Sequence, residues 1–260
     1  MIQSRLTDFL KKYNLLSIYQ SGFRNQRSTV DNLFYFCQKS YENYYENERT
    51  QCGIVFDIAK AFDNVWHNGL LYKMNQMKMP KNLGFWIKQF LSERKFFIKL
   101  NQASSQKLPI EASTPQGSIL SPTLFSIFIN DIIDLNTFPN NKIKSLLFAD
   151  DLFSISWDYN INFLRLSLQR YLDHLEIWLN KWRLCIAAHK CSFNIYKKGQ
   201  LPKEIKNGSF KLKIFGEEIP LEVHPKYLGI YLDKNCNFNL HVDNIVEKCK
   251  KLLNILKIGL

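Results

Sequence analysis

Residues 146–157 read LLFADDLFSISW, two apolar runs on either side of the adjacent acids Asp150 and Asp151. Over 153–157 apolar residues alternate with serines, the period of a half-buried strand, and residues 142–148 read as a second strand. The two acids therefore lie at the tip of a predicted β-hairpin. Adjacent carboxylates repel each other, and a divalent cation held between them and a phosphate relieves that repulsion. Asp also favours turns through its local hydrogen bonds, so the pair alone is consistent with a turn or with a metal site.

A second apolar segment also ends in an acid. Residues 51–58 read QCGIVFDI and are apolar and β-branched up to Asp57. One more carboxylate beside Asp150 and Asp151 completes an oxygen-rich set of the kind that Mg²⁺ prefers, with positions left for water and substrate phosphates. The sequence therefore predicts a magnesium site built from Asp57, Asp150 and Asp151.

Three segments together resemble a known family: residues 56–67 read FDIAKAFDNVWH, residues 114–122 read TPQGSILSP and residues 148–151 read FADD. In order and spacing they closely resemble the reverse transcriptases of LINE-type (non-LTR) retrotransposons, and the resemblance runs from about residue 20 to about residue 233. It implies an α+β right-hand polymerase palm, with an antiparallel sheet that carries the three acids on one rim and helices on one face. It also implies RNA-directed DNA polymerisation, with an RNA template, a DNA primer and dNTPs as partners.

The resemblance further implies the chemistry of the acidic site. In the family, a primer 3′-hydroxyl attacks the α-phosphorus of a dNTP with the help of two Mg²⁺ ions, for which Mn²⁺ can substitute. The three acids would hold the metals together with the backbone carbonyl of Ile58. Lys190 matches the family position proposed to protonate the departing pyrophosphate. Its alternative is a surface lysine without a partner, and Ala187 stands where the family usually carries asparagine.

The resemblance also assigns residues to the nucleotide. Phe62 matches a bulky position that screens the sugar, where a ring would clash with a ribose 2′-hydroxyl and tolerate deoxyribose; an ordinary core aromatic is the alternative. Gln116 and Gly117 match a loop that lies against the nucleotide and the template base, and glycine there lets backbone approach a ligand. Ser113 departs from the small glycine usual in that loop.

Two arginines, Arg24 and Arg27, precede a predicted helix that Ser28 and Asp31 open with a capping box. Guanidinium groups beside the free N–H groups of a helix N-terminus suit phosphate binding. A solvated basic loop is the alternative. By resemblance the segment belongs to the fingers, which makes both arginines candidates for contacts with template or incoming triphosphate.

Composition sets the wider class of the protein. The 260 residues carry 35 Lys and Arg against 23 acids, a net charge of +12 and a pI near 9.3, and this balance suits a protein that handles polyanions. The six cysteines show no zinc-ligand spacing, so we expect reduced thiols in an intracellular protein. The apolar runs are shorter than the ~18 residues of a membrane helix, so no membrane association is expected.

The periodicity of apolar residues predicts the elements along the chain. Helices are expected over 2–16, 28–47, 67–77, 80–94, 115–135, 164–182 and 239–258. Strands are expected over 51–58, 95–100, 106–112, 142–148 and 153–157, with a further strand motif at 224–233 that resembles a primer grip. By resemblance, residues 1–50 are part of the fingers, 51–234 the palm and 235–260 the start of a thumb.

The resemblance also leads us to expect a fragment. Family members place a further fingers motif upstream, continue into a full thumb and often carry an endonuclease domain. A catalytically weak or inactive nucleic-acid-binding remnant is therefore the alternative function, and another metal-dependent phosphoryl chemistry, such as nucleotide cyclisation, is a third. Copying at chromosomal DNA would require entry into the nucleus, but no dense basic run predicts a localisation signal, so nuclear residence is implied by resemblance alone.

Overall fold

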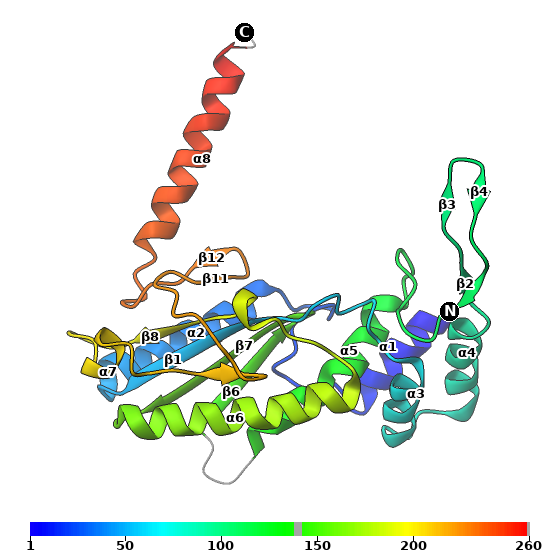
Figure 1. Ribbon diagram of the computed structural model, residues 1–260, viewed down its shortest axis with the longest axis horizontal. Helices are drawn as coiled ribbons and strands as arrows, with labels where there is room; N and C mark the ends of the chain where they lie inside the picture. The colour runs from blue at the N-terminus through cyan, green and yellow to red at the C-terminus, as the bar shows by residue number, and fades with distance from the viewer. Residues whose placement is uncertain (138–141, 259–260) are drawn as a thin grey trace.

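A four-stranded antiparallel sheet forms the centre of the protein. The computed structural model describes residues 1–137 and 142–258. The strand order is β6 (Ile143–Phe148), β7 (Asp151–Asp158), β1 (Thr50–Asp57) and β8 (Ser192–Tyr196), and every neighbouring pair is antiparallel (Figure 1). The α+β class and the antiparallel sheet expected from the sequence are confirmed.

One face of this sheet packs on the long helix α6 (Ile161–Trp182), which Asn160 opens by accepting hydrogen bonds from the amides of Asn162 and Phe163. Alternate residues of β1, Cys52, Ile54 and Phe56, lie in the same buried cluster as the apolar side of α6. Their period of two is the period of a strand with one face on a core. The helix expected over 164–182 is therefore present and begins three residues earlier, at Ile161.

The alternation over residues 153–157 predicts that the serines of β7 face solvent. In the structure these serines are buried instead. Ser154 is fully buried against α6, and its hydroxyl lies 2.8 Å from Ser145 Oγ and 2.7 Å from Tyr171 Oη, while Ser145 and Tyr171 are 3.0 Å apart. Buried hydroxyls are tolerated when each one has a hydrogen-bond partner. Ser154 thus marks a polar contact between sheet and helix, whereas the buried hydroxyl of Ser156 has no hydrogen-bond partner among the described residues.

The opposite face of the sheet is covered as well. Helix α2 (Thr29–Tyr41) begins at the capping box of Ser28 and Asp31, as expected, and continues as a π-helical turn over Glu42–Glu46. Its Phe36 makes edge-to-face contacts with Phe153 of β7 and Tyr196 of β8. Gly53 of β1 leaves room for these rings, because a Cβ there would lie 2.8 Å from Phe153.

Apart from α2, the α-helices of residues 1–137 gather at one end of the sheet (Figure 1). They are α1 (Ile2–Lys12), α3 (His67–Gln76), α4 (Lys81–Leu91) and α5 (Ser121–Ile129), which continues as a 3₁₀ helix over Asn130–Thr137. Helix α1 ends before the predicted residue 16, since Asn14 adopts a left-handed φ of 49°. Asn130 ties the following loop to the body: it accepts from Ser17 N at 2.8 Å and donates to Leu15 O at 3.0 Å.

Short ribbons and a terminal helix complete the chain. β2 (Lys95–Phe96) pairs with β5 (Leu108–Pro109), and β3 (Lys99–Leu100) with β4 (Ala103–Ser104), so the strands expected over 95–100 and 106–112 are present as a broken hairpin. Beyond β8 follow the short helix α7 (Lys203–Lys206) and the pairs β9 (Lys213–Ile214) with β10 (Glu217–Glu218) and β11 (Lys226–Tyr227) with β12 (Ile230–Tyr231). Helix α8 (Asn239–Ile258) stands away from the body, and the hairpin β2–β5 projects to the same side from the other end (Figure 1). In the described part of the chain no helix has the length and apolar character to cross a membrane.

A lysine is buried among the helices. Lys73 of α3 is 5% exposed, and its ammonium donates to the carbonyl of Phe128 and to the carboxylate of Asp131. It also lies 3.7 Å from the ring centroid of Trp182. Burial lowers the pKa of Lys73 to about 8, although Asp131 opposes that shift. The unfavourable free energy of burying the charged ammonium therefore exceeds the favourable free energy of its ion pair with Asp131.

This buried lysine predicts a pH dependence of stability. Its folded pKa of about 8 lies below the ordinary 10.5, so between these values the unfolded chain binds more protons than the folded one, and stability rises with pH. We expect the free energy of unfolding of wild type to gain roughly 3 kcal/mol relative to Lys73→Met between pH 8 and 10.5. Urea unfolding of both proteins across this range measures it, and parallel curves would contradict the assignment.

Candidate active site

The two strand ends that carry the predicted acids meet at one edge of the sheet. Asp57, the last residue of β1, is the cross-strand partner of Asp151, the first residue of β7. Residues paired in this way have Cα atoms about 4.5–5.5 Å apart. Asp150 lies in the turn between β6 and β7, next to Ala149, whose φ is 58°. The structure thus places the three predicted acids at the same edge of the sheet.

The acids form an uncompensated negative cluster. The pKa of Asp151 is raised by burial and by the charges of Asp150 and Asp57. No ion pair within the described residues involves any of the three. Because like charges so close together disfavour ionisation, a cation is the group that this cluster suits best.

The donor set fits a cation that takes further ligands from elsewhere. Within ranges 1–137 and 142–258, no three His, Cys, Asp or Glu side chains converge closely enough to enclose one ion. The centre of the candidate cation site is therefore the cross-strand pair of Asp57 and Asp151, with Asp150 beside it and the backbone of Ile58 directly after it. Mg²⁺ usually binds through one or two carboxylates and completes its octahedron with water and phosphate, so this set is compatible with it.

The segment that holds Lys190 adjoins the end of β1. Ile58 forms a bridge with Ile186, and the amide of Ala59 donates to the carbonyl of Cys185 at 2.9 Å. The Lys190 side chain is exposed at the end of the short 3₁₀ turn Ala188–Lys190. The next residue, Cys191, is buried beside Asp57, and burial followed by the Asp57 charge raises its pKa to about 11. Sequence reasoning missed this thiol, because nothing in its spacing distinguishes it from the other cysteines.

A pocket of about 430 Å³ opens near this edge: Phe23 lines it, and the preceding Gly22 lies against the backbone of Ala149 in the turn between β6 and β7. The pocket is lined by Phe23, Phe62, Thr114, Gln116, Gly117, Ser118, Ile119, Ser121 and Pro122. Phe62 stacks on the buried ring of Phe125 with centroids 4.5 Å apart and meets Phe23 edge-to-face at 5.9 Å. The structure thus brings three predicted nucleotide residues, Phe62, Gln116 and Gly117, into one pocket.

The loop of this pocket is closed by a hydrogen bond from the amide of Ser118 to the carbonyl of Pro115 at 3.1 Å. Gln116 Nε2 lies 3.4 Å from the carboxylate of Asp63, to which it donates. Gly117 has a φ of 80°, which favours glycine, and a Cβ there would meet no atom within 4 Å. The space above the loop is therefore open to a ligand.

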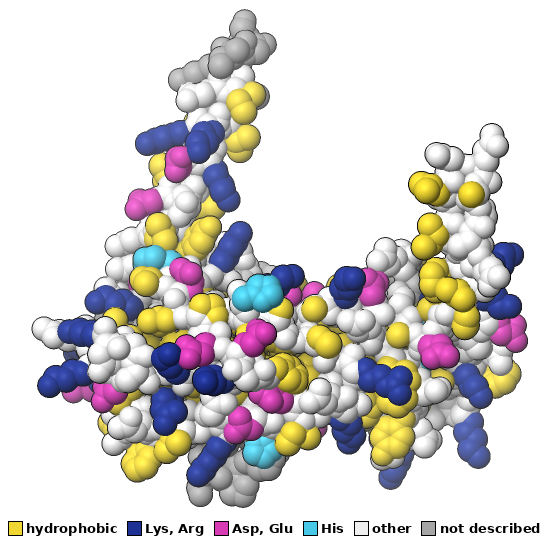
Figure 2. Space-filling model, viewed as in Figure 1, with side chains coloured by type: hydrophobic (Ala, Val, Ile, Leu, Met, Phe, Trp, Pro, Cys, Tyr) yellow, Lys and Arg dark blue, Asp and Glu magenta, His cyan; other side chains and the backbone are white. Residues whose placement is uncertain are grey.

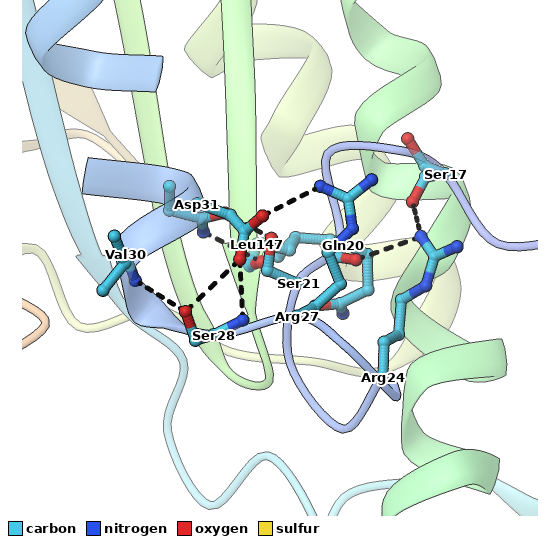
Figure 3. A network of polar contacts seen from close by, with 10 residues as sticks. Ser17, Gln20, Ser21, Arg24, Arg27, Ser28, Val30, Asp31 and Leu147 are labelled. Atoms are coloured by element: carbon cyan, nitrogen blue, oxygen red, sulfur yellow. Dashed lines mark hydrogen bonds and ion pairs between the residues drawn. The ribbon is translucent and has the colours of Figure 1, made fainter. Parts of the chain in front are cut away.

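The two predicted arginines do not converge on a common point (Figure 3). The guanidinium of Arg24 donates to the carbonyls of Ser17 and Gln20, at 2.5 and 3.2 Å. Burial and the neighbouring charge of Arg27 lower the pKa of Arg24. Arg27 pairs instead with Asp31 at 3.2 Å across one helical turn. Both remain candidates for phosphate contacts, and both have protein partners in this structure.

A buried asparagine that sequence reasoning missed ties these segments to the hairpin that carries Asp150 and Asp151. Asn32 of α2 is 2% exposed and accepts a hydrogen bond from Ser21 Oγ at 2.7 Å. Its amide donates to the carbonyl of Leu147 on β6 and to Tyr227 Oη on β11, both at 3.0 Å. One side chain therefore joins the arginine segment, the hairpin that carries Asp150 and the strand motif of 224–233. The sequence offers no signal for it, since its partners lie far apart in the chain.

Comparisons with known proteins agree with this geometry. The sequence profile of the family described as "Reverse transcriptase (RNA-dependent DNA polymerase)" matches residues 1–232. The RNA-directed DNA polymerase from mobile element jockey of Drosophila melanogaster is 34% identical over 88% of this chain and 24% of its own length. The probable RNA-directed DNA polymerase from transposon BS of the same species is 28% identical over 99% of this chain and 28% of its own length.

Solved structures show the same fold. Apo telomerase from Candida tropicalis, truncated from its C-terminal domain, matches with a TM-score of 0.60 at 13% identity, over 91% of this chain and 44% of that one. Telomerase from C. tropicalis in complex with a TWJ fragment of telomeric RNA matches with a TM-score of 0.62 at 10% identity, over 92% of this chain and 36% of that one.

The chain spans about a quarter of the length of the curated relatives it matches, 24% of the jockey protein and 28% of the BS protein. Further relatives include polyproteins of the type-1 retrotransposable element R2, such as that of Nasonia vitripennis, 27% identical over 68% of this chain and 18% of its own length. Profile, relatives and fold point the same way: the chain belongs to the reverse transcriptase (RNA-dependent DNA polymerase) family, as a reverse transcriptase domain of the non-LTR retrotransposon type.

Proposed function

We propose that this chain polymerises DNA on an RNA template, adding dNTPs to the 3′-hydroxyl of a primer. The observation that carries the proposal is the cross-strand pair of Asp57 and Asp151, with Asp150 beside it, at the sheet edge next to the Phe62 pocket. Carboxylates without cationic partners beside an open pocket suit a reaction in which metal and triphosphate arrive together.

The three acids share one proposed role, which is to hold the metal. The reverse transcriptase family generally uses a divalent metal, and here Asp57, Asp150 and Asp151, with the carbonyl of Ile58, would hold Mg²⁺ or Mn²⁺. When bound, the metal supplies positive charge that lowers the pKa of the primer hydroxyl and offsets the charge of the leaving pyrophosphate. The chain's own contribution is the rigid sheet edge, since the paired strand ends fix the relative positions of Asp57 and Asp151.

The nucleotide would occupy the pocket beside the acids. Gln116 and Gly117 would lie against the base and its template partner, and the Phe62 ring, backed by Phe125, would stand where a ribose 2′-hydroxyl would project. Lys190 is proposed to donate a proton to pyrophosphate, and Arg24 and Arg27 to contact template or triphosphate. These roles imply that residues 1–50 act as part of the fingers, 51–234 as the palm and 235–260 as the start of a thumb.

Primer extension tests the proposal directly. A DNA primer annealed to RNA should be extended by this chain with dNTPs and Mg²⁺ or Mn²⁺, and EDTA should stop the reaction. The absence of extension under any metal, with binding of the primer–template that weakens steeply with salt, would select a non-catalytic nucleic-acid-binding protein instead.

The pocket predicts how the enzyme selects its sugar. In Phe62→Val the ring is lost while an apolar contact with Phe125 remains, so a ribose 2′-hydroxyl gains room. We expect the ratio of kcat/KM for a ribonucleotide to that for the matching deoxyribonucleotide to rise on the order of 10²-fold.

Single-nucleotide incorporation kinetics measure this ratio. Ile119→Ala is a matched control, because Ile119 also lines the pocket but is 77% exposed. It should leave the ratio near that of wild type. An unchanged ratio in Phe62→Val would identify Phe62 as a packing residue only.

A further inference from the structure

Residues 94–110 form the hairpin β2–β5, which we call the ribbon. It extends beyond the body of the protein (Figure 1). Asn101 opens its two-residue turn with a φ of 55°. Between its two short ladders, Ser105 N donates to Ile98 O and Ser105 Oγ accepts from Ile98 N, both at 2.8 Å. The ribbon thus forms many of its backbone hydrogen bonds within itself, and most of its side chains face solvent.

The ribbon combines exposed apolar and cationic side chains. Its large apolar residues are Phe96, Phe97, Ile98, Leu100 and Leu108, which are 45, 51, 66, 72 and 51% exposed. Its exposed cations are Lys95, Lys99 and Lys107, while Arg94 at its base is half-buried, and residues 94–110 contain no acid. Figure 2 shows hydrophobic side chains gathered along the ribbon and basic ones near its base. A two-stranded ribbon is marginally stable alone, and so much exposed apolar surface indicates a binding partner.

The base of the ribbon is connected to the nucleotide pocket. After β5, the amide of Ser113 donates to the carbonyl of Val65 at 2.9 Å. The amide of Thr114 then donates to the carbonyl of Phe62 at 3.0 Å, and the chain continues into the Gln116 loop. The chain that leaves the ribbon therefore leads directly into the pocket loop. The ribbon itself rises at the opposite end of the body from α8 (Figure 1).

We propose that this ribbon binds the single-stranded part of the template before it is copied. This inference rests on the proposed function. Aromatic side chains that stack on bases, with cations that contact phosphates, are the combination by which proteins hold single strands. A segment with four cations and no acid is complementary to phosphates rather than to a protein surface of mixed charge. An unpaired template, unlike a duplex, has base faces free to stack on Phe97.

Fluorescence anisotropy with two labelled primer–templates tests the ribbon. Both carry the same RNA–DNA duplex; one is blunt and the other continues into a single-stranded 5′ RNA overhang. We expect wild type to bind the overhang substrate about tenfold more tightly. Phe97→Ser and the triple variant K95Q/K99Q/K107Q should each lose this preference and keep their affinity for the blunt duplex. In the triple variant, the slope of log K against log salt for the overhang substrate should fall by about 2.

A matched control changes the same charge elsewhere. K198Q/K203Q/K206Q removes three exposed lysines in and near α7, at the other end of the body, and should retain the preference for the overhang. All substituted side chains are exposed, so melting temperatures should stay at the wild-type value.

Two results would overturn the proposal: a wild type without preference for the overhang, or ribbon variants that retain that preference. Equal loss of affinity for both substrates would also count against it, since it would show general attraction to polyanions. The measurement contains no dNTPs. A wild type that binds as expected but never extends a primer would therefore refute the proposed function and leave the ribbon result standing.

Discussion

Asparagine in place of Asp151 is expected to lower RNA-templated primer extension on the order of 10³-fold or more, and to raise the melting temperature in metal-free buffer slightly. Primer extension should fall because Asp151 and Asp57 form the cross-strand pair at the centre of the candidate cation site. The melting temperature should rise because burial and the charges of Asp150 and Asp57 raise the pKa of Asp151 in the folded chain. At neutral pH the ionised carboxylate is therefore less stable in the folded chain than in the unfolded one, and the neutral amide removes that cost.

Two controls separate these effects. Asp173→Asn removes an exposed acid on α6 and should change neither activity nor melting temperature appreciably. Adding Mg²⁺ should raise the melting temperature of wild type and leave that of Asp151→Asn nearly unchanged, since a ligand stabilises the state that binds it. Full extension by Asp151→Asn would refute the assignment of the cation site. A lower melting temperature in that variant would show that the carboxylate stabilises the fold.

The central sheet and its acidic strand ends are predictable from local sequence. Residues 142–158 combine apolar strand patterns with a central pair of acids, and Asp57 ends an apolar run, so each acid could be placed at a strand end. The capping box of Ser28 and Asp31 is likewise a local signal, and α2 begins there. These features involve neighbours along the chain, which is why a single sequence reveals them.

Features that depend on tertiary contacts were not predictable. The burial of Ser154 depends on Tyr171 of α6, and a serine that alternates with apolar residues has the same pattern whether it faces solvent or another hydroxyl. The contacts of Asn32 join residues 11, 115 and 195 positions away. In the structure the guanidinium of Arg24 contacts the carbonyls of Ser17 and Gln20, and that of Arg27 contacts the carboxylate of Asp31, which only coordinates reveal. Contact of either arginine with template or triphosphate stays a prediction.

Gly22 is another residue whose importance appears only in three dimensions. The segment before it runs beside β6: Gln20 forms a parallel bridge with Leu147, and Ser21 N donates to Leu147 O at 2.9 Å. Gly22 then lies against the catalytic turn. A Cβ added to it would come 2.1 Å from the backbone nitrogen of Ala149, the residue before Asp150, and 2.9 Å from the Ala149 Cα.

Gly22→Ala is therefore expected to lower primer extension on the order of 10²-fold or more, because misplacing a catalytic group by about 1 Å has an effect of that size. The obstacle is backbone rather than a flexible side chain, so the turn that carries Asp150 must shift. Gly84→Ala is the matched control: nothing lies within 4 Å of its added Cβ, and in the interior of α4 the change should stabilise the protein by about 0.5–1 kcal/mol without loss of activity. Steady-state kinetics and urea unfolding of both variants measure these effects. Wild-type activity in Gly22→Ala would mean that the turn absorbs the added methyl group without moving Asp150.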